Sequence, residues 1–560
     1  MHVPARSAVL AAAATLALAL AGCGSAEVSV PSSSPTAEAG LAPTSGSGAA
    51  SDPSGGAGSD SGSGSGTAAE PVATSQTIDA TLATLKAAHS VDEVDSASAI
   101  PVQLGGSSAT SDSAAVTSAD GTVTISAGGT YRLTGELSGQ VVVDAGEEKV
   151  ALILDGAAIT SDTSPALAIT SADEATIVLA DGTTSTLTDG AGYSTEADNA
   201  PNAALFSADD FSITGTGALT VTGNTNDGIA SKDGLVISSG TITVNALDDG
   251  IRGKDYLHVS GGALTVTAGG HALKSDNADE AAVGWVALLG GTQDLTATED
   301  GINAQTILLG ASTTTISAAD DGAHADAAMV VDGTTLTITE SYEGLEALQM
   351  TIAAGALEIH ADDDGINIAG GVDGSQATGG RGGDMFAVLE GAFVHILGGE
   401  IVIYAEGDGF DSNGDALMSG GTLTVHGPTS GGNGAIDVNG TFEITGGTLV
   451  AGGSSGMAEA PDAASSQGWV SVTFSGTVPA GTTIEIAGDD DAVLASYTGA
   501  KTFSSVIFST AELTSGAEYT VLAGGEALGT VVAGQHVGGF GPGGGAPGGG
   551  GPGGGGGPRR

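Results

Sequence analysis

Acidic residues stand directly before a glycine at a regular long interval through the middle of this 560-residue chain. They are Asp227, Asp249, Asp300, Asp321, Glu343, Asp364 and Asp408. His271-Ala272 stands where one further acid-Gly pair would be expected. When Ala272 is counted as a glycine position, successive positions are separated by 22, 22, 29, 21, 22, 21 and 44 residues. A period near 22 residues predicts that the acids lie on successive turns of a stacked structure, where neighbouring strands are about 4.8 Å apart.

Carboxylates at this spacing repel each other by about 3 kcal/mol at an effective dielectric constant of about 20. A column of them needs protonation, outward splaying or a bound cation. Calcium binds oxygen at about 2.3–2.6 Å, so an ion between two turns contacts oxygens about 4.6–5.2 Å apart. We therefore expect calcium as the cofactor, bound by Asp248, Asp249, Asp300, Asp320, Asp321, Glu343, Asp363, Asp364 and Asp408. The alternative is that each Asp-Gly pair only marks a turn.

Basic residues are concentrated in one part of the same region. The chain has 12 lysines and arginines and a formal net charge of −54, yet four of the 12 fall within 43 residues. The candidate carbohydrate-binding residues are Arg252, Lys254, Lys274 and Lys232, with Asn303 and with Tyr342 as a stacking aromatic. Asn303 belongs to an outward polar column that continues with His324, Glu346, Asn367 and Asp411 and could bind sugar hydroxyls, although a solvated face explains it equally well. A cationic patch beside calcium is suited to uronate carboxylates. The alternative is that the basic residues form surface ion pairs with Asp233, Asp255 and Asp276.

Apolar columns accompany the acids and indicate the elements that position them. The residues six positions before the glycine positions are Val244, Val266, Leu295, Ile316, Ile338, Ile359 and Ile403. Such columns, with a local alternation of two, are typical of stacked strands. The pattern predicts an all-β fold, a parallel β-helix solenoid with about 21–22 residues per coil. The strong negative charge excludes a general nucleic-acid binder, since phosphates would be repelled.

The two ends of the chain differ in composition from its middle. Residues 1–23 have an apolar run and end in Leu-Ala-Gly-Cys, which predicts a lipoprotein signal peptide with lipidation at Cys23. We expect a Ser/Gly/Pro-rich tether at 24–75, the β-helix carbohydrate-binding domain at 76–460 and a C-terminal cap or small β-unit at 461–535. A Gly/Pro-rich tail is expected at 536–560. The expected location is the extracellular face of the cell membrane, through a lipid anchor.

Several strings are similar to those of one known family, over most of the range from Gly129 to about Gly525. Among them are "NDGIASKDGLVISSGTITV", "DDGIRGKDYLHVSGGALTVTA", "YEGLEA", "DDDGIN" and "GDGFDSNG". They resemble the bacterial carbohydrate-binding-domain proteins of polysaccharide-lyase-like β-helix fold. The resemblance implies a right-handed parallel β-helix that binds calcium, and that binds cellulose and pectic acid without cleaving them. His271-Ala272 departs from the acid-Gly pattern of the family.

The sequence favours a polysaccharide-binding, non-enzymatic surface lipoprotein, which we expect to be a monomer. One alternative is a calcium-dependent polysaccharide lyase acting on uronate polymers, in which Arg252, Lys254 or Lys274 removes the proton at the sugar C5. The other alternative is a structural or adhesive surface protein without a sugar site. Formation of unsaturated products from polygalacturonate distinguishes the lyase from the binding protein.

The lipoprotein prediction is tested by Cys23→Ser. This change removes the sulfur that carries the lipid, so the variant should appear in the medium or remain unprocessed, whereas the parent chain fractionates with membranes. Membrane fractionation followed by immunoblotting measures the difference. Full retention of the variant in the membrane fraction contradicts the prediction.

Overall fold

The computed structural model describes residues 75–195, 200–369 and 387–540. In these ranges the chain is mainly β-strand, with one short α-helix, α1 (Ile78–Leu82), and one 3-10 turn, η1 (Ser96–Ser98). Cys23, residues 24–74 of the predicted 24–75 tether and residues 541–560 of the predicted 536–560 tail lie outside the described residues. The start of the predicted tail is wrong, because residues 536–540 form strand β42 (His536–Phe540). Within the described ranges, the helices are too short to cross a lipid bilayer.

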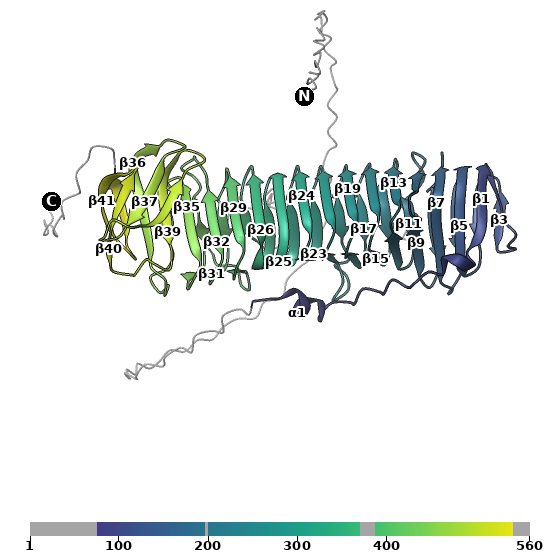
Figure 1. Cartoon of the computed structure of the whole chain (residues 1–560), viewed down its shortest axis with the longest axis horizontal. Helices are drawn as coiled ribbons and strands as arrows, with labels where there is room; N and C mark the ends of the chain where they lie inside the picture. Colours follow the sequence, from purple (N-terminus) through teal and green to yellow (C-terminus); the bar gives the residue numbers. More distant parts are fainter. Residues whose placement is uncertain (1–74, 196–199, 370–386, 541–560) are drawn as a thin grey trace, which may run out of the picture. The chain divides into compact units, whose positions relative to one another are not determined.

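Most strands belong to three parallel ladders that surround one core. Figure 1 shows their strands side by side in chain order, from purple near β1 to yellow near β39. Because the alternating apolar residues of each strand face inward, stacking the strands buries a continuous column. Long strands such as β25 (Ala323–Glu340) and β26 (Leu345–Ala361) turn the corners and take part in all three ladders.

Ladder one contains, in chain order, β1 (Ile100–Gly106), β5 (Gly129–Ser138), β7 (Val150–Thr160), β10 (Thr184–Thr188), β13 (Ala218–Gly223), β16 (Thr241–Ala246), β19 (Ala263–Ala268), β22 (Thr292–Ala297), β24 (Thr313–Ala318), β25, β26, β29 (Glu400–Ala405), β32 (Thr422–His426) and β35 (Thr448–Gly453). Ladder two contains β4 (Thr122–Ile125), β6 (Gln140–Asp144), β8 (Leu167–Ser171), β11 (Ala203–Ser207), β14 (Asp227–Ser231), β17 (Ile251–Gly253), β20 (Leu273–Ser275), β23 (Ile302–Leu309), β25, β26, β27 (Ile366–Ile368), β30 (Phe410–Ser412) and β33 (Asp437–Val438). Ladder three contains β5, β7, β9 (Ala175–Leu179), β12 (Phe211–Gly215), β15 (Gly234–Ile237), β18 (Tyr256–Val259), β21 (Trp285–Leu288), β23, β25, β26, β28 (Phe393–Ile396), β31 (Asp415–Met418) and β34 (Phe442–Ile444).

The predicted right-handed parallel β-helix solenoid with about 21–22 residues per coil is wrong, although the all-β class is correct. The described strands of the ladders join one closed sheet, and antiparallel strands cover both of its ends. β2 (Ser108–Thr110) pairs with β1 and β3 (Val116–Ala119) with β4 at one end, and β39 (Phe503–Ser509) pairs with β35 at the other. The physical reason is that an open solenoid would leave unpaired N–H and C=O groups on its terminal strands.

The repeat is also less regular than predicted. Along ladder one, the aligned positions are Thr184, Ala218, Thr241, Ala263, Thr292, Thr313, Thr335, Ala356, Glu400, Thr422 and Thr448. Their differences are therefore 34, 23, 22, 29, 21, 22, 21, 44, 22 and 26 residues. The period near 22 residues holds only for the shortest turns. Longer turns carry insertions in the connections between strands, and these insertions do not change the register of the ladder.

The glycine of each acid-Gly pair is required by close packing. An ideal Cβ on Gly344 would lie 2.2 Å from the carbonyl oxygen of Gly365 and 2.4 Å from Cγ2 of Ile359. The backbone of Gly344 is not in the positive-φ region, so the conformational explanation for the Asp-Gly pair does not apply there. Successive turns meet at these glycines without space for a side chain.

The C-terminal part, predicted as a cap or small β-unit at 461–535, contains two groups of strands. β36 (Trp469–Val478), β39 and β42 (His536–Phe540) join the main sheet. β37 (Thr483–Ala487), β38 (Val493–Thr498), β40 (Glu518–Ala523) and β41 (Glu526–Val532) form a separate four-stranded antiparallel sheet. The buried side chains of both groups form a second apolar cluster that includes Val470, Ile486 and Phe508.

The core register is tested by Ile359→Asp. Ile359 is fully buried and aligned with Ile338 on one side and Ile403 on the other. A buried charge without a partner costs several kcal/mol, so the variant should unfold at a clearly lower denaturant concentration. Glu358→Ala, at the exposed neighbouring position, is the matched control and should unfold like the parent. Equal midpoints for Ile359→Asp and the parent would show that the register is wrong.

Candidate functional site

The acids of the predicted column lie where the chain passes from ladder one to ladder two. Five of them, Asp227, Asp249, Asp300, Asp321 and Glu343, are only 1–5% exposed. Asp248 is exposed, and Asp320, Asp363, Asp364 and Asp408 are partly buried. The structure therefore brings the predicted metal ligands together in one column, with the carboxylates nearest the glycines the most buried.

Three of the buried carboxylates, those of Asp249, Asp300 and Asp321, accept a backbone N–H of the next turn. Oδ1 of Asp300 accepts the N–H of Asp321 at 3.1 Å, and Oδ1 of Asp321 accepts the N–H of Glu343 at 3.2 Å. His271 takes the same role, because its Nδ1 accepts the N–H of Asp300 at 3.2 Å. A histidine nitrogen therefore replaces a carboxylate oxygen at the position where the acid-Gly pattern is interrupted. The acids thus have a structural role that needs no metal.

A second polar column runs beside the acids on the outward side of ladder two. Its residues, each two positions after a glycine position, are Arg252, Lys274, Asn303, His324, Glu346, Asn367 and Asp411, in continuous register. The sequence alone left a solvated face as an equal explanation for the later members. That explanation is wrong for His324, Glu346 and Asn367, which are 2–8% exposed.

In the first half of the site, the second column neutralises the first. Lys274 Nζ lies 3.1 Å from Asp249 Oδ2, and Arg252 Nη1 lies 3.9 Å from Asp227 Oδ2 while its guanidinium also binds Asp276 with contacts of 2.7–3.1 Å. Burial opposes the charge of His324, but its contacts with Asp321, Asp326 and Glu346 outweigh this effect and raise its pKa. Protein cations therefore supply part of the charge that a metal ion would supply in this half, while Asp300, Asp320 and Asp321 still bring three carboxylate oxygens within 4.8 Å of one another.

The second half carries acids with less compensation, and the cation nearest to it is His324, whose Nδ1 lies 2.8 Å from Glu346 Oε2. Burial, followed by the neighbouring carboxylates, raises the pKa of Glu343, Asp364 and Asp411 to about 8. Burial is also the main cause that raises the pKa of Asp408 to about 6. We call the group Glu343, Glu346, Asn367, Asp364, Asp408 and Asp411 the acidic cluster.

Two acceptor oxygens in the acidic cluster have no hydrogen-bond partner among the described residues. They are Oε1 of Glu346 and Oδ1 of Asn367, which belong to side chains that are 2% and 8% exposed. Glu346 and Asn367 are direct neighbours in the ladder, and Nδ2 of Asn367 donates to Oε2 of Glu343 at 2.8 Å. Unpaired buried oxygens are costly, and a cation with oxygen ligands would satisfy them. The donor set therefore fits a hard cation such as calcium.

The predicted carbohydrate-binding residues are not all equivalent. Arg252 and Lys274 are held in ion pairs, and Asn303 donates to Asp300 Oδ2 at 2.7 Å. Among the described residues, Lys232 and Lys254 form no salt bridge, and burial lowers the pKa of Lys232. These two lysines are partly exposed neighbours. The ion-pair alternative therefore holds for Arg252 and Lys274, although the partner of Lys274 is Asp249 and not a residue named from the sequence.

Tyr342 lies away from the basic residues. It is 38% exposed, and its hydrogen bond to Asp363 is the main cause that raises its pKa to about 12. From the sequence, Glu346, Asn367 and Asp411 were not recognised as candidate metal ligands. Their shared spacing, two residues after each glycine position, was the available signal.

The raised pKa values predict that the fold loses stability as pH increases. Glu343 and Asp364 have ordinary values of 4.5 and 3.8 and folded values of about 8, so the folded chain binds more protons than the unfolded chain between these limits. In chelator, the melting temperature should therefore fall as pH rises from about 5 to about 8. Asp364→Asn/Asp411→Asn should flatten this slope in a thermal melt. A melting temperature that rises with pH contradicts the expectation.

Three comparisons relate parts of this chain to known proteins. Residues 119–381 match the model of the family described as carbohydrate-binding domain-containing protein. A carbohydrate-binding domain-containing protein of Acetivibrio thermocellus is 45% identical over 185 residues, which cover 32% of this chain and 65% of that protein, just under two thirds of its length. A solved polysaccharide lyase-like protein from C. thermocellum, as a gadolinium derivative, is 34% identical, covering 39% of this chain and 91% of that chain with a TM-score of 0.38. The middle of this chain is therefore similar to carbohydrate-binding domain-containing proteins.

Proposed function

We propose that this protein binds an acidic polysaccharide with the help of calcium held by the acidic cluster. The observation that carries the proposal is the pair of unpartnered buried oxygens on Glu346 and Asn367, beside carboxyls whose pKa is raised to about 8. Glu343, Glu346, Asn367, Asp364 and Asp411 would hold the ion. When bound, it would supply positive charge that offsets their mutual repulsion and attracts the carboxylate groups of a uronate polymer.

Lys232 and Lys254 are the residues best placed to contact the same polymer. Among the described residues they form no salt bridge, so their ammonium groups remain available for a uronate carboxylate. Four turns separate Lys254 from Glu343, or about 19 Å at the usual strand spacing. An extended polysaccharide spans this distance. The name of the Acetivibrio relative supports a carbohydrate ligand.

Binding without cleavage is the better-supported form of this function. A lyase needs an uncharged base close to the substrate. Arg252 is paired with Asp276 and Lys274 with Asp249, so both are held as cations and are poorly suited to remove a proton. Lys254 is the remaining candidate base, and an increase in ultraviolet absorbance during incubation with polygalacturonate would favour the lyase.

We also propose that Cys23 carries a lipid that holds the protein at the extracellular face of the membrane.

Calcium should stabilise the fold through the acidic cluster. An ion bound only by the folded state adds about 2.7 kcal/mol for one site at a hundredfold excess over Kd. Chelation should therefore lower the melting temperature of the parent chain, and Asp364→Asn/Asp411→Asn should make the response to calcium much smaller. Asp489→Asn/Asp490→Asn, in an exposed turn of the C-terminal sheet, is the matched control and should respond like the parent. Equal responses of both double variants would refute the metal assignment.

Glycan binding should depend on different residues from calcium stability. Lys232→Ala/Lys254→Ala should weaken retention on polygalacturonate, most clearly at low salt where exposed charges are least screened, and leave the calcium response of the melt unchanged. The assay is a pull-down in calcium and again in chelator. Unchanged retention of the lysine variant, together with loss of stability, would show that the lysines support the fold and not the ligand.

A further inference from the structure

Residues 75–95 lie along the outside of ladder three and are called the strap. In Figure 1 the purple segment passes from α1, beneath β23 and β25, to the end that contains β1. Ser75 Oγ lies 2.8 Å from His395 Nδ1, and at the far end Asp92 Oδ2 lies 2.7 Å from Lys149 Nζ. The strap therefore crosses many turns of the ladder, in the direction opposite to the order of the strands.

Side chains hold the strap in place. Among the described residues, one backbone–backbone hydrogen bond joins it to the rest of the chain, from Lys86 N to Ala282 O at 2.6 Å. Ile78, Leu82 and Leu85 pack on an apolar cluster of ladder three. Since no strand pairing has to be broken, the strap can separate from ladder three without opening the sheet.

The centre of the contact is an ammonium group between two carboxylates. Lys86 Nζ lies 2.5 Å from Asp233 Oδ1 and 2.6 Å from Asp255 Oδ2, and 5.6 Å from the centre of the Tyr256 ring. Asp210, on the preceding turn, lies 3.7 Å from His89 Nδ1 and accepts from Tyr256 Oη at 3.2 Å. Two carboxylates and an aromatic ring together form a binding site for an ammonium ion. Lys86 fills it from within the same chain.

The strap leaves polar atoms beneath it unsatisfied. Trp285 is 1% exposed and stacks on Tyr256 with ring centres 4.9 Å apart, but its Nε1–H has no acceptor among the described residues. Nε2 of His258, on the neighbouring position of the same face, also has no partner. The strap, through Lys86, therefore neutralises the two carboxylates of this face but leaves Trp285 Nε1 and His258 Nε2 without hydrogen-bond partners among the described residues.

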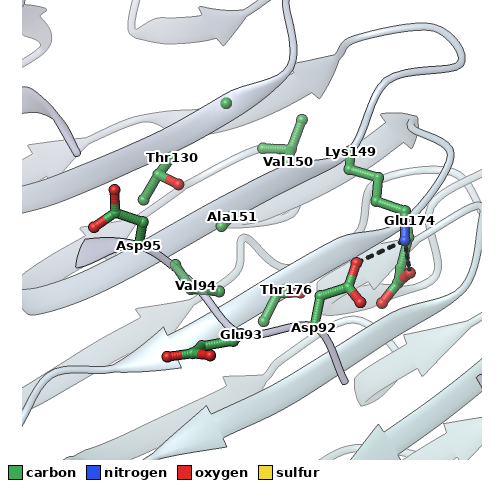
Figure 2. Close-up of a pocket in the computed structure, with 11 residues that line it drawn as sticks. Asp92, Glu93, Val94, Asp95, Thr130, Lys149, Val150, Ala151, Glu174 and Thr176 are labelled. Atoms are coloured by element: carbon green, nitrogen blue, oxygen red, sulfur yellow. Dashed lines mark hydrogen bonds and ion pairs between the residues drawn. The ribbon is translucent and has the colours of Figure 1, made fainter. Parts of the chain in front are cut away.

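At the far end of the strap the charges are reversed, because the lysine, Lys149, belongs to the sheet and the carboxylate, Asp92, to the strap. Figure 2 shows Lys149 directed at both Asp92 and Glu174, with Thr130, Ala151 and Thr176 on the sheet beside them. A cavity of about 190 Å³ lies among these residues. Oε1 of Glu174 is buried and unpartnered, although its Oε2 lies 2.8 Å from Lys149 Nζ. Space and an unused acceptor are thus present between the strap and ladder three.

We propose that the face beneath the strap is a second binding site, for a glycan that carries primary amino groups, and that the strap competes with this ligand. The ammonium groups of such a glycan would replace Lys86 between Asp233 and Asp255, and its hydroxyls would pair with Trp285 Nε1 and His258 Nε2. The formal net charge of −54 attracts a polycation to the protein. This site is separate from the acidic cluster, so it does not depend on the function proposed above.

A β-1,4-linked glucosamine hexamer is the probe, and the N-acetylglucosamine hexamer, which has no ammonium group, is the matched ligand control. Calorimetry at mildly acidic pH should give at least a tenfold higher affinity for glucosamine hexamer with Lys86→Met than with the parent. Methionine keeps most of the apolar stem but removes the internal competitor. Lys501→Met removes a lysine outside the strap and should show no gain. Adding Asp233→Asn/Asp255→Asn to Lys86→Met should abolish the gain.

A measurement on the unaltered protein makes the test independent of any variant that fails to fold. Saturation with glucosamine hexamer should raise the rate of hydrogen–deuterium exchange at the Lys86 N–H, as measured by mass spectrometry, because displacement of the strap breaks its hydrogen bond to Ala282 O. No change in this rate, an equal gain for Lys501→Met, or equal binding of the acetylated hexamer overturns the proposal. Stronger binding of a synthetic 75–95 peptide than of the hexamer to Lys86→Met would show that the face accepts peptide instead.

Discussion

The spacing of about 4.8 Å between paired strands is the constraint on which the rest of this structure depends. It places equivalent side chains of successive turns in contact. For apolar residues such as Ile338, Ile359 and Ile403, this contact builds the core. For acids it creates repulsion that each turn must offset, and the offset differs along the molecule. Backbone N–H groups pair with Asp249, Asp300 and Asp321. The basic side chains Arg252, Lys274 and His324 contact acids in the first half of the column.

The same solution is used on a different ladder. Lys86 offsets Asp233 and Asp255 on ladder three as Lys274 offsets Asp249 beside ladder two. In a chain with 12 basic residues against 66 acidic ones, these few cations are placed where carboxylates would otherwise stack without compensation. The acidic cluster begins where the second polar column changes from basic side chains to acidic and amide side chains. Its unpartnered oxygens and raised pKa values follow from that change in composition.

Close packing at the glycines links the core to this polar site. Because a Cβ at Gly344 would collide with the backbone of the next turn, the turns approach each other at the point where the acids stand. This approach brings the Asp321 carboxylate within hydrogen-bond distance of the N–H of Glu343. The acid and the glycine are therefore two parts of one arrangement: the glycine permits the contact, and the acid satisfies the donor that the contact buries.

The sequence by itself determined which residues share a column, because the period repeats visibly: the acids, the inward isoleucines and the outward polar residues are all found at their predicted registers. It also determined the all-β class. Only the tertiary structure decided that the ends are closed, that Glu346 and Asn367 are buried, and that Arg252 and Lys274 are held in ion pairs. The contact of Lys86 with Asp255 spans 169 residues, and a period near 22 carries no information about it. A sequence repeat identifies the residues that are neighbours along a ladder. The segment that covers a ladder is determined by contacts between side chains from distant parts of the chain.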